Sequence, residues 1–286
     1  MTEPRVGWLG LGAMGAPMAR RLIASGHVLQ SFDPSPPADL LRQHCTDPAG
    51  AATDVALLCV MVADAGQLDA ALFGPAGAAE SLPAEAVVVV FSTVGPDAVR
   101  SVAKRLTQPV LDAPVSGGPV RAGIGELVAM TSGPDVAVRA AAAVVDRLAS
   151  TVAHFGERPG TGQAVKMVNQ LLAGVHLAAA AEALMLAERL GLPVEEVFDL
   201  VQRGAAASFM LSDRGPRMLR EPAGPAASAV DIFVKDMGLV LEVSATAGAR
   251  TPLAALAAAS FDAVAAAGGG RADDSQVVRA YRPASA

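Results

Sequence analysis

Three short stretches of this sequence combine residue types that can bind a nucleotide or move a proton. The first is a GxGxxG pattern that follows the apolar run Val6 to Leu9 and opens a predicted helix near Ala13. A glycine turn there lets the backbone approach a pyrophosphate, which the N-terminus of the helix stabilises. The order of strand, loop and helix favours a dinucleotide site over a merely glycine-rich turn. The predicted contacts are Gly10, Leu11, Gly12, Ala13, Met14 and Gly15.

An acidic residue follows this loop at the spacing that a dinucleotide site needs. Asp33 ends the second predicted strand, 18 residues after Gly15. A carboxylate at that position accepts hydrogen bonds from the adenosine ribose and repels a 2′-phosphate, which favours NAD over NADP. The alternative is an aspartate that caps a turn or a helix.

The second stretch, Asp112 to Pro119, is a strand end that breaks into a Ser-Gly-Gly turn. The hydroxyl of Ser116 and the backbone amides of Gly117 and Gly118 form a small nest suited to a carboxylate, and ligands of open α/β sheets bind beyond the strand ends. Taken alone, the stretch also fits an ordinary turn.

The third stretch contains a lysine on a predicted helix. Lys166, Asn169 and Gln170 follow the i, i+3, i+4 spacing that places them on one face of an otherwise apolar segment. Oxidation of an alcohol requires a base for the hydroxyl proton, and a partly desolvated lysine with a lowered pKa can be that base. The alternative is a surface lysine whose aliphatic stem covers apolar neighbours.

The elements that position these stretches fall into two halves. Up to residue 156, β-branched apolar runs alternate with helical stretches, which predicts an α/β Rossmann domain with a doubly wound parallel sheet. After Gly160 the sequence is rich in Ala and Leu at helical spacing, so an all-α domain that begins with a long interdomain helix is expected. The predicted domains are residues 1–157 and 158–286, and a cleft between two such domains is the usual place for a cofactor. The predicted strands are Val6–Leu9, Val28–Phe32, Val55–Val62, Ala86–Phe91, Val110–Leu111, Leu127–Thr131 and Thr151–Phe155.

Composition and charge exclude several classes of function. The formal net charge is −6, and basic residues do not cluster, so a nucleic-acid partner is not expected. Two cysteines without metal-ligand spacing predict neither a disulfide framework nor a metal site. No signal peptide is visible, and the charged residues of the helix from Gln163 to Leu190 are expected to break any membrane-length run, so a cytoplasmic protein without a membrane partner is predicted.

Four motifs in order resemble those of the β-hydroxyacid dehydrogenase family, which includes 3-hydroxyisobutyrate dehydrogenase, tartronate semialdehyde reductase and the related 6-phosphogluconate dehydrogenases. The resemblance spans nearly the whole chain. The motifs are GLGAMGAPMARRL at Gly10–Leu22, DAPVSGGPVRAGIGEL at Asp112–Leu127, GTGQAVKMVNQ at Gly160–Gln170 and VKDMGL at Val234–Leu239.

The resemblance implies a role for each site residue. Lys166 is expected to be the catalytic acid/base, and Ser116, Gly117 and Gly118 are expected to hold the substrate carboxylate. Many members have Asn four residues after the lysine, where this chain has Gln170, so either Asn169 or Gln170 is expected to orient the substrate. The remaining expected cofactor contacts are Met61, Val62, Thr93 after the fifth strand, and Lys235 beside the nicotinamide.

The second half resembles the L-threonate dehydrogenase group, which implies NAD-dependent oxidation of a four-carbon sugar acid at C2. The alternatives are 3-hydroxyisobutyrate dehydrogenase, tartronate semialdehyde reductase, an imine reductase and a non-catalytic dinucleotide-binding module. Lys166 argues against the last two, and Asp33 argues against the NADPH that imine reductases use. The Ala-rich helices and the resemblance imply a homodimer or homotetramer. His176 and Asp231 are expected to be structural, with His176 packed in the protein.

Overall fold

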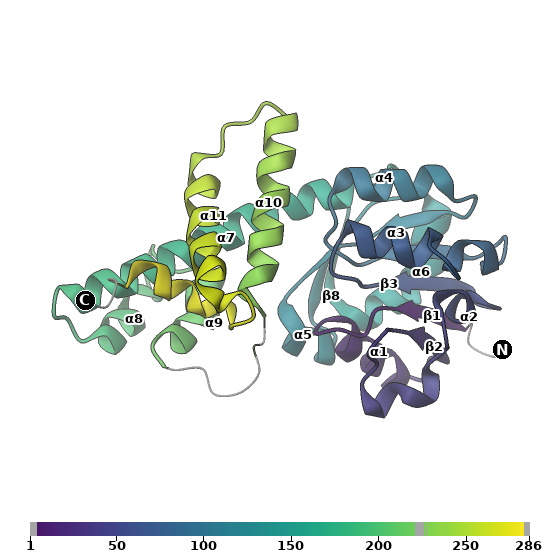
Figure 1. The fold of residues 1–286 in the computed structure, drawn as a ribbon, viewed down its shortest axis with the longest axis horizontal. Coiled ribbons are helices and arrows are strands. Elements are labelled where there is room, and N and C mark those ends of the chain that lie inside the picture. The colour runs from purple at the N-terminus through teal and green to yellow at the C-terminus, as the bar shows by residue number, and fades with distance from the viewer. Residues whose placement is uncertain (1–4, 221–225, 227, 283–286) are drawn as a thin grey trace. The chain divides into compact units, whose positions relative to one another are not determined.

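The computed structural model describes residues 5–220, 226 and 228–282, which divide into two compact units, Met1–Lys166 and Met167–Ala286 (Figure 1). The division falls inside helix α7 (Thr161–Arg189), nine residues after the boundary predicted from the sequence. Hydrogen bonds explain the difference, because Gly162 and Gln163 at the start of α7 donate backbone N–H groups to Ser132 and Asp112 of the first unit.

A five-stranded parallel sheet forms the centre of the first unit, in the order β2-β1-β3-β4-β5. Alternate residues of β4 belong to two different buried clusters, Val87 and Val89 to one and Val88 and Val90 to the other. Both faces of the sheet are therefore covered, as the all-apolar strands predict. The strands are β1 (Val6–Leu9), β2 (Leu29–Phe32), β3 (Leu57–Val60), β4 (Val87–Val90) and β5 (Val110–Asp112).

Helices supply the apolar residues that bury the two faces of this sheet. One cluster contains residues of α1 (Gly15–Ala24) and α6 (Asp135–Leu148), and the other contains residues of α2 (Pro48–Ala52), α3 (Ala65–Phe73) and α4 (Pro96–Arg105). The predicted doubly wound arrangement is confirmed. Short 3₁₀ turns at Ala38–Gln43 and Ala78–Ser81 complete the connections.

A second, three-stranded sheet differs from the prediction, which grouped Leu127–Thr131 and Thr151–Phe155 with the parallel strands. Here β6 (Val115–Ser116) pairs antiparallel with β7 (Leu127–Thr131), which pairs parallel with β8 (Ala149–His154). Proline at position 114, between β5 and β6, has no N–H to continue a ladder, and the chain changes sheet there. Helix α5 (Gly118–Ile124) connects β6 to β7.

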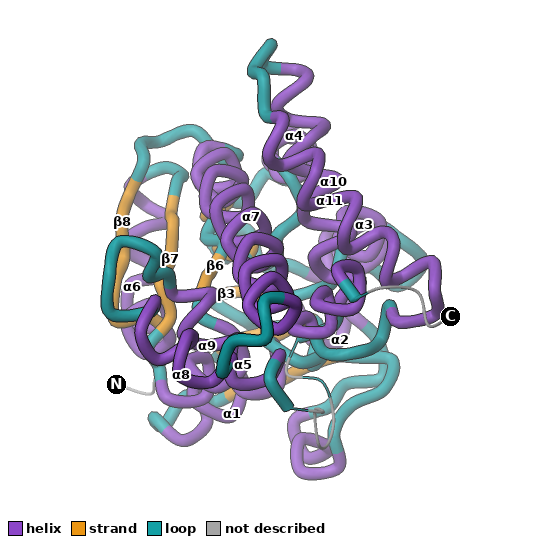
Figure 2. The backbone as a smooth tube through the Cα atoms, turned by 90° about the vertical axis from the view of Figure 1, so that its left-hand side faces the viewer, coloured by secondary structure: helices purple, strands orange, loops and turns teal. Residues whose placement is uncertain are grey.

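The regular elements among the described residues of the second unit are helices, and the last strand of the described chain, β8, ends at His154. Figure 2 shows the helices in purple and the strands in orange. Phe233 and Phe261 stack at 4.9 Å in its core. A Cβ atom at Gly174 would lie 2.3 Å from Met237 Sδ, so glycine lets α7 and α10 approach closely. Besides α7, the helices are α8 (Val194–Val201), α9 (Phe209–Met218), α10 (Val230–Thr246), α11 (Pro252–Val264), a π turn at Ala265–Gly269 and a 3₁₀ helix at Asp274–Tyr281.

By length and composition alone, two helices of the described chain are able to cross a membrane, Thr161–Arg189 and Pro252–Gly269. The expectation that charged residues break every such run in the first helix is therefore wrong. The observation is weak evidence for a membrane, because the core helix of a soluble protein passes the same test and half of the apolar window in Thr161–Arg189 is buried.

Candidate active site

The predicted cofactor residues of the first unit gather at one edge of the large sheet. All five strands are parallel, so their carboxyl ends lie on the same side. Gly10 follows β1, Asp33 follows β2, Met61 follows β3 and Thr93 follows β4. The strand order reverses between β1 and β3, which is where open α/β sheets bind nucleotides. Thr93 thus follows the fourth strand of the chain and not the fifth.

The glycines of the first loop have different tasks. Gly10 has φ of +93°, and a Cβ atom there would lie 2.2 Å from the carbonyl oxygen of Met61. A Cβ atom at Gly15 would lie 2.0 Å from the carbonyl oxygen of Gly10. A Cβ atom at Gly12, in contrast, would meet nothing within 4 Å. The fold itself therefore requires the first and last glycines, whereas the middle one leaves an open cradle that fits a pyrophosphate.

Helix α1 begins at Gly15, two residues after the predicted start. Its N-cap residue, Met14, makes no capping hydrogen bond through its side chain, and the first turn contains no acidic residue. The backbone N–H groups at a helix N-terminus that lacks a side-chain cap are suited to an anion. The residues present in the loop and in α1 therefore fit a dinucleotide.

Asp33 is fixed beside this loop by two backbone donors. Its Oδ2 accepts from the N–H of Leu11 at 2.6 Å, and its Oδ1 accepts from the N–H of Ser35 at 2.8 Å. A carboxylate offers about four acceptor positions, so this geometry leaves capacity for ribose hydroxyls.

The ends of β3 and β4 are tied together by a serine that the sequence analysis did not select. The buried Ser92 hydroxyl accepts from the N–H of Val62 at 2.7 Å and lies 3.4 Å from the carbonyl oxygen of Val60. The N–H of Met61 donates to the carbonyl of Leu9 at 2.8 Å. Met61 and Val62 therefore lie beside the glycine loop.

The Ser-Gly-Gly stretch is more regular than the predicted turn. Ser116 ends β6 opposite Val128, Gly117 has φ of +139° and precedes a helix, and Gly118 is the first residue of that helix, α5. Ser116, Gly117 and Gly118 are each half-buried. Their hydroxyl and backbone amides are partly accessible to a ligand.

Lys166 is only 5% exposed, which excludes the solvent-exposed surface lysine considered from the sequence. It lies one helical turn after Gln163, in the first part of α7. A buried network of hydrogen bonds around Asp112 and Gln163 holds that first turn.

Asp112 and Gln163 fix the start of α7 to the sheet, and both are fully buried. The Asp112 Oδ2 accepts from the N–H groups of Gly160 and Gln163, each at 2.9 Å, and from the Ser132 hydroxyl at 3.1 Å. The Gln163 Nε2 donates to Asp112 Oδ1 and to the carbonyl of Ser92, both at 2.9 Å. Its Oε1 accepts from the N–H groups of Val94 and of the glycine at position 95, at 3.0 and 3.1 Å.

Burial raises the pKa of the Asp112 carboxyl, and the hydrogen bonds from Gln163, Gly160 and Ser132 oppose that rise. The three N–H groups that contact it are donors only, so they favour the ionised form of the carboxyl. The network thus joins the ends of β4 and β5 to the turn that precedes Lys166.

The second unit contains another buried polar chain, built around Asp236 of α10. Asp236 Oδ1 lies 2.8 Å from the Nζ atom of Lys235, and its Oδ2 accepts from Gln170 Nε2 at 2.5 Å. Gln170 Oε1 in turn accepts from Asn169 Nδ2 at 2.8 Å. Three of these residues were predicted to contact the substrate or the cofactor, and the structure brings them together through Asp236.

Sequence reasoning missed Ser92, Asp112, Gln163 and Asp236 as individual residues. A signal was present, because each is a polar residue within or beside an apolar run, and such a residue needs a buried partner. His176 is exposed, so the expectation that it is a packed histidine is wrong.

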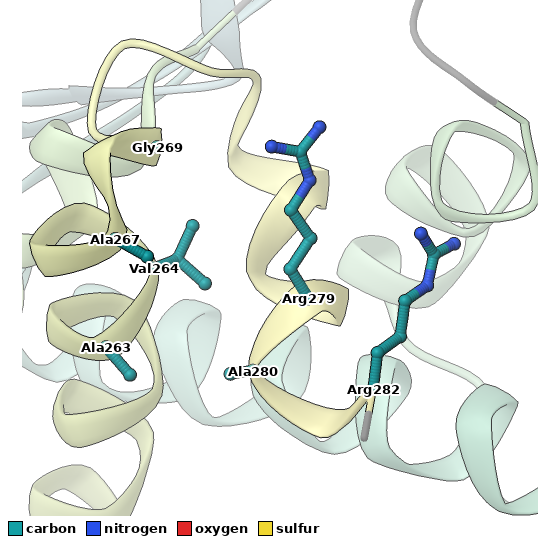
Figure 3. A pocket seen from close by; sticks show the side chains of 7 residues that line it. All are labelled: Ala263, Val264, Ala267, Gly269, Arg279, Ala280 and Arg282. Carbon is teal, nitrogen blue, oxygen red and sulfur yellow. The ribbon is translucent and has the colours of Figure 1, made fainter. Parts of the chain in front are cut away.

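A pocket of about 300 Å³ lies elsewhere in the second unit, where α11, the π turn and the 3₁₀ helix meet (Figure 3). It contains none of the predicted site residues. Among residues 5–220, 226 and 228–282, no group of three His, Cys, Asp or Glu side chains is arranged to hold a metal ion. The pocket is lined by Ala263, Val264, Ala267, Gly269, Arg279, Ala280 and Arg282.

Comparison with known proteins agrees with this arrangement. Residues 5–156 match the NAD-binding domain of 6-phosphogluconate dehydrogenase, and residues 160–281 match the NAD-binding domain of NADP-dependent 3-hydroxyisobutyrate dehydrogenase. An L-threonate dehydrogenase from Cupriavidus necator is 38% identical, over 96% of this chain and 95% of that protein. An L-threonate dehydrogenase from Escherichia coli K12 is also 38% identical, over 98% and 95%.

A solved structure shows the same fold. The crystal structure of a 3-hydroxyisobutyrate dehydrogenase from Salmonella typhimurium superposes with a TM-score of 0.89 and 37% identity, over 97% of this chain and 99% of that one. Both halves of the chain are thus matched by dehydrogenases along nearly their whole length.

Proposed function

The chain belongs to the β-hydroxyacid dehydrogenase family, and we propose that it oxidises a four-carbon sugar acid such as L-threonate at C2. It is an NAD-dependent hydroxy-acid dehydrogenase by that membership. The observation that supports the chemistry best is the burial of Lys166 one turn after Gln163, whose hydrogen bonds fix the helix start to the sheet edge. The substrate is proposed from the two L-threonate dehydrogenases at 38% identity.

The cofactor, when bound, supplies the acceptor for the hydride. In this proposal the backbone from Gly10 to Gly15 holds the pyrophosphate at the start of α1, and Asp33 accepts hydrogen bonds from the ribose. Met61, Val62 and Thr93 line the adenosine and nicotinamide sides of the sheet edge, and Lys235 contacts the nicotinamide end. Asp33 also repels a 2′-phosphate, so NAD is preferred to NADP.

The substrate is oriented by its carboxylate. The hydroxyl of Ser116 and the amides of Gly117 and Gly118 hold that group, which places the hydroxyl carbon for reaction. Lys166 Nζ takes the proton of the C2 hydroxyl while C2 gives up its hydrogen as hydride, and a carbonyl forms. In the reverse direction the same ammonium returns the proton.

We further propose a homodimer or homotetramer located in the cytoplasm. Support comes from apolar side chains exposed on two helices, Val168 and Leu172 on α7 and Leu253 and Leu256 on α11, with exposed fractions from 49% to 70%. Such apolar faces are typical of subunit contacts.

An assay of NADH formation at 340 nm tests the proposal directly. Purified protein with NAD is given each stereoisomer of threonate and erythronate, 3-hydroxyisobutyrate, glycerate and 6-phosphogluconate, and tartronate semialdehyde is tested with NADH. We expect turnover on a threonate or erythronate. Preferential turnover of 3-hydroxyisobutyrate would show that the enzyme oxidises C3 instead of C2. Preferential reduction of tartronate semialdehyde would show that it is a tartronate semialdehyde reductase. Tight NAD binding without turnover of any of these compounds would overturn the proposed substrate class.

A further inference from the structure

Asp236 connects three residues of the proposed site and is itself almost fully buried, at 3% exposure. One of its oxygens lies 2.8 Å from Lys235 Nζ, and the other accepts from Gln170 at 2.5 Å. A carboxylate oxygen accepts hydrogen bonds, so Gln170 presents the donor end of its amide, Nε2, to Asp236. Asp236 therefore dictates which end of the Gln170 amide faces it.

The direction of the Gln170 amide determines the direction of the next one. Gln170 must present Nε2 to Asp236, so its Oε1 faces Asn169. An oxygen accepts, and Asn169 must therefore present Nδ2, at 2.8 Å. The chain of hydrogen bonds runs from Asn169 to Gln170 to Asp236, and neither amide can turn over without placing two donors or two acceptors against each other.

The consequence is a fixed orientation of Asn169. Its Nδ2 faces Gln170, so its carbonyl Oδ1 is directed away from that residue. Asn169 is half-buried and lies one helical turn after Lys166 on α7, whereas Gln170 is 7% exposed and both ends of its amide are engaged. Asn169 is thus the amide able to meet a substrate, and Oδ1 is an acceptor for a hydroxyl.

We propose that Asp236 is a positioning residue that acts through Gln170 to make Asn169 Oδ1 the acceptor for a second substrate hydroxyl. That hydroxyl lies on the carbon next to the oxidised one. The enzyme then selects 2,3-dihydroxy acids over acids that lack the 3-hydroxyl. This inference rests on the proposed oxidation at C2 and adds the group that determines specificity.

The test compares L-threonate with 2,4-dihydroxybutanoate of the same C2 configuration, which differs only in the missing 3-hydroxyl. For the wild type we expect kcat/KM to be about tenfold or more higher with L-threonate, the value of one hydrogen bond of about 1.4 kcal/mol. In Asp236→Asn the new amide can donate to Gln170, the two amides can turn over, and the ratio falls towards one. Loss of the Lys235 ion pair lowers both rates together and does not move this ratio.

A double variant makes the test specific to the direction of the hydrogen bonds. In Asp236→Asn combined with Gln170→Glu, the new Asn donates to the new carboxylate, which again accepts from Asn169. We expect the ratio of the two kcat/KM values to return to within about threefold of the wild-type ratio, because the second substitution restores the acceptor that faces Asn169. Such a recovery appears as coupling between the two substitutions. Asp231→Asn, at an exposed aspartate at the start of the same helix, is the matched control and leaves the ratio unchanged.

Two results overturn the inference. One is a wild-type enzyme that oxidises both acids with nearly equal kcat/KM. That result leaves the proposed oxidation at C2 intact but shows that the enzyme does not select for the 3-hydroxyl. The other is a ratio that Asp236→Asn does not change or that the double variant does not restore. Turnover of 3-hydroxyisobutyrate alone overturns the proposed substrate instead. In that case urea unfolding, followed by circular dichroism at 222 nm, tests the hydrogen-bond chain by itself. A urea midpoint that Asp236→Asn lowers and the double variant restores supports the chain, and a midpoint that the double variant does not restore refutes it.

Discussion

Replacing Gln163 with Leu is expected to lower the stability of the first unit more than the same substitution does at a buried glutamine with weaker hydrogen bonds. The side chain is 0% exposed, and it makes four hydrogen bonds. Leucine has a similar volume but no polar atoms. The substitution therefore leaves two backbone N–H groups, one carbonyl and one carboxylate oxygen buried without this partner.

The magnitude follows from those four groups. An unsatisfied buried polar group costs roughly 1–3 kcal/mol, so even the lower limit for four groups is about 4 kcal/mol. That is a large fraction of the total stability of a domain, which is about 5–15 kcal/mol. Because Gln163 also joins the Ser92–Gly95 loop to the turn before Lys166, we expect kcat to fall as well.

Urea unfolding followed by the fluorescence of Trp8 measures the loss of stability in the first unit, which contains both Trp8 and Gln163. Trp8 is the single tryptophan of the chain, is fully buried in β1 and stacks on Phe91. Gln108→Leu is the matched control, because this glutamine is also buried but its hydrogen bonds are longer. Its Nε2 contacts two carbonyls at 3.3 and 3.4 Å, near the limit of hydrogen bonding, and its Oε1 accepts from the part-buried Thr107 hydroxyl at 3.1 Å. Its expected loss is below about 1.5 kcal/mol. Equal losses in the two variants refute the reasoning.

Three further predictions follow from buried or paired groups. Burial raises the pKa of the Cys59 thiol far above its usual range, so DTNB should titrate only Cys45 in the native protein and both thiols in urea; two native thiols contradict this. Arg214→Met removes the ion-pair partner at 3.0 Å from Asp274, a buried carboxyl whose pKa burial already raises, and leaves it the more distant Arg217 at 3.8 Å. Because the ionised form of Asp274 is then poorly compensated, thermal unfolding should show a loss of stability of about 3–5 kcal/mol at pH 8 and a smaller loss at pH 5; equal losses contradict this prediction. Asp33→Ala should lower the NAD to NADP ratio of kcat/KM by about tenfold, and an unchanged ratio removes this residue from cofactor selection.

The pH prediction depends on the sign of the shift at Asp274. A carboxyl whose folded pKa lies above its unfolded value contributes its stability below the unfolded pKa, about 4, and loses it as the pH rises through the folded pKa. Arg214 lowers the pKa of Asp274 and so limits that loss. Without the guanidinium the folded pKa rises further, and the penalty grows between pH 4 and pH 8.

The large sheet could be predicted from the sequence because its signal is local. Val87 to Val90 is an unbroken apolar run, and such a run is typical of a strand buried on both faces. The glycine loop could be predicted for the same reason, since strand, turn and helix are contiguous. In contrast, β8 is largely exposed, and its assignment to a second sheet depends on pairing with β7, which no local pattern specifies.

The hydrogen-bonded supports of the site could not be predicted from spacing. Asp112 and Gln163 are 51 residues apart, and Gln170 and Asp236 are 66 apart. Only folding brings such pairs together. Their motifs were recognised, but the sequence does not state which polar residue in a motif contacts a ligand and which one orients a neighbour. The choice between Asn169 and Gln170 is of this kind, because it depends on an acceptor in another helix.

The measurement that tests the central claim most directly is single-turnover hydride transfer in Lys166→Met, at saturating NAD, with the hydroxy acid that the wild type oxidises best. A buried lysine that takes the hydroxyl proton contributes about 10²–10⁴-fold to the rate, so the step should slow by that factor while the dissociation constant for NADH stays within about threefold. Hydride transfer within a few-fold of the wild type would contradict the assignment of Lys166 as the acid/base.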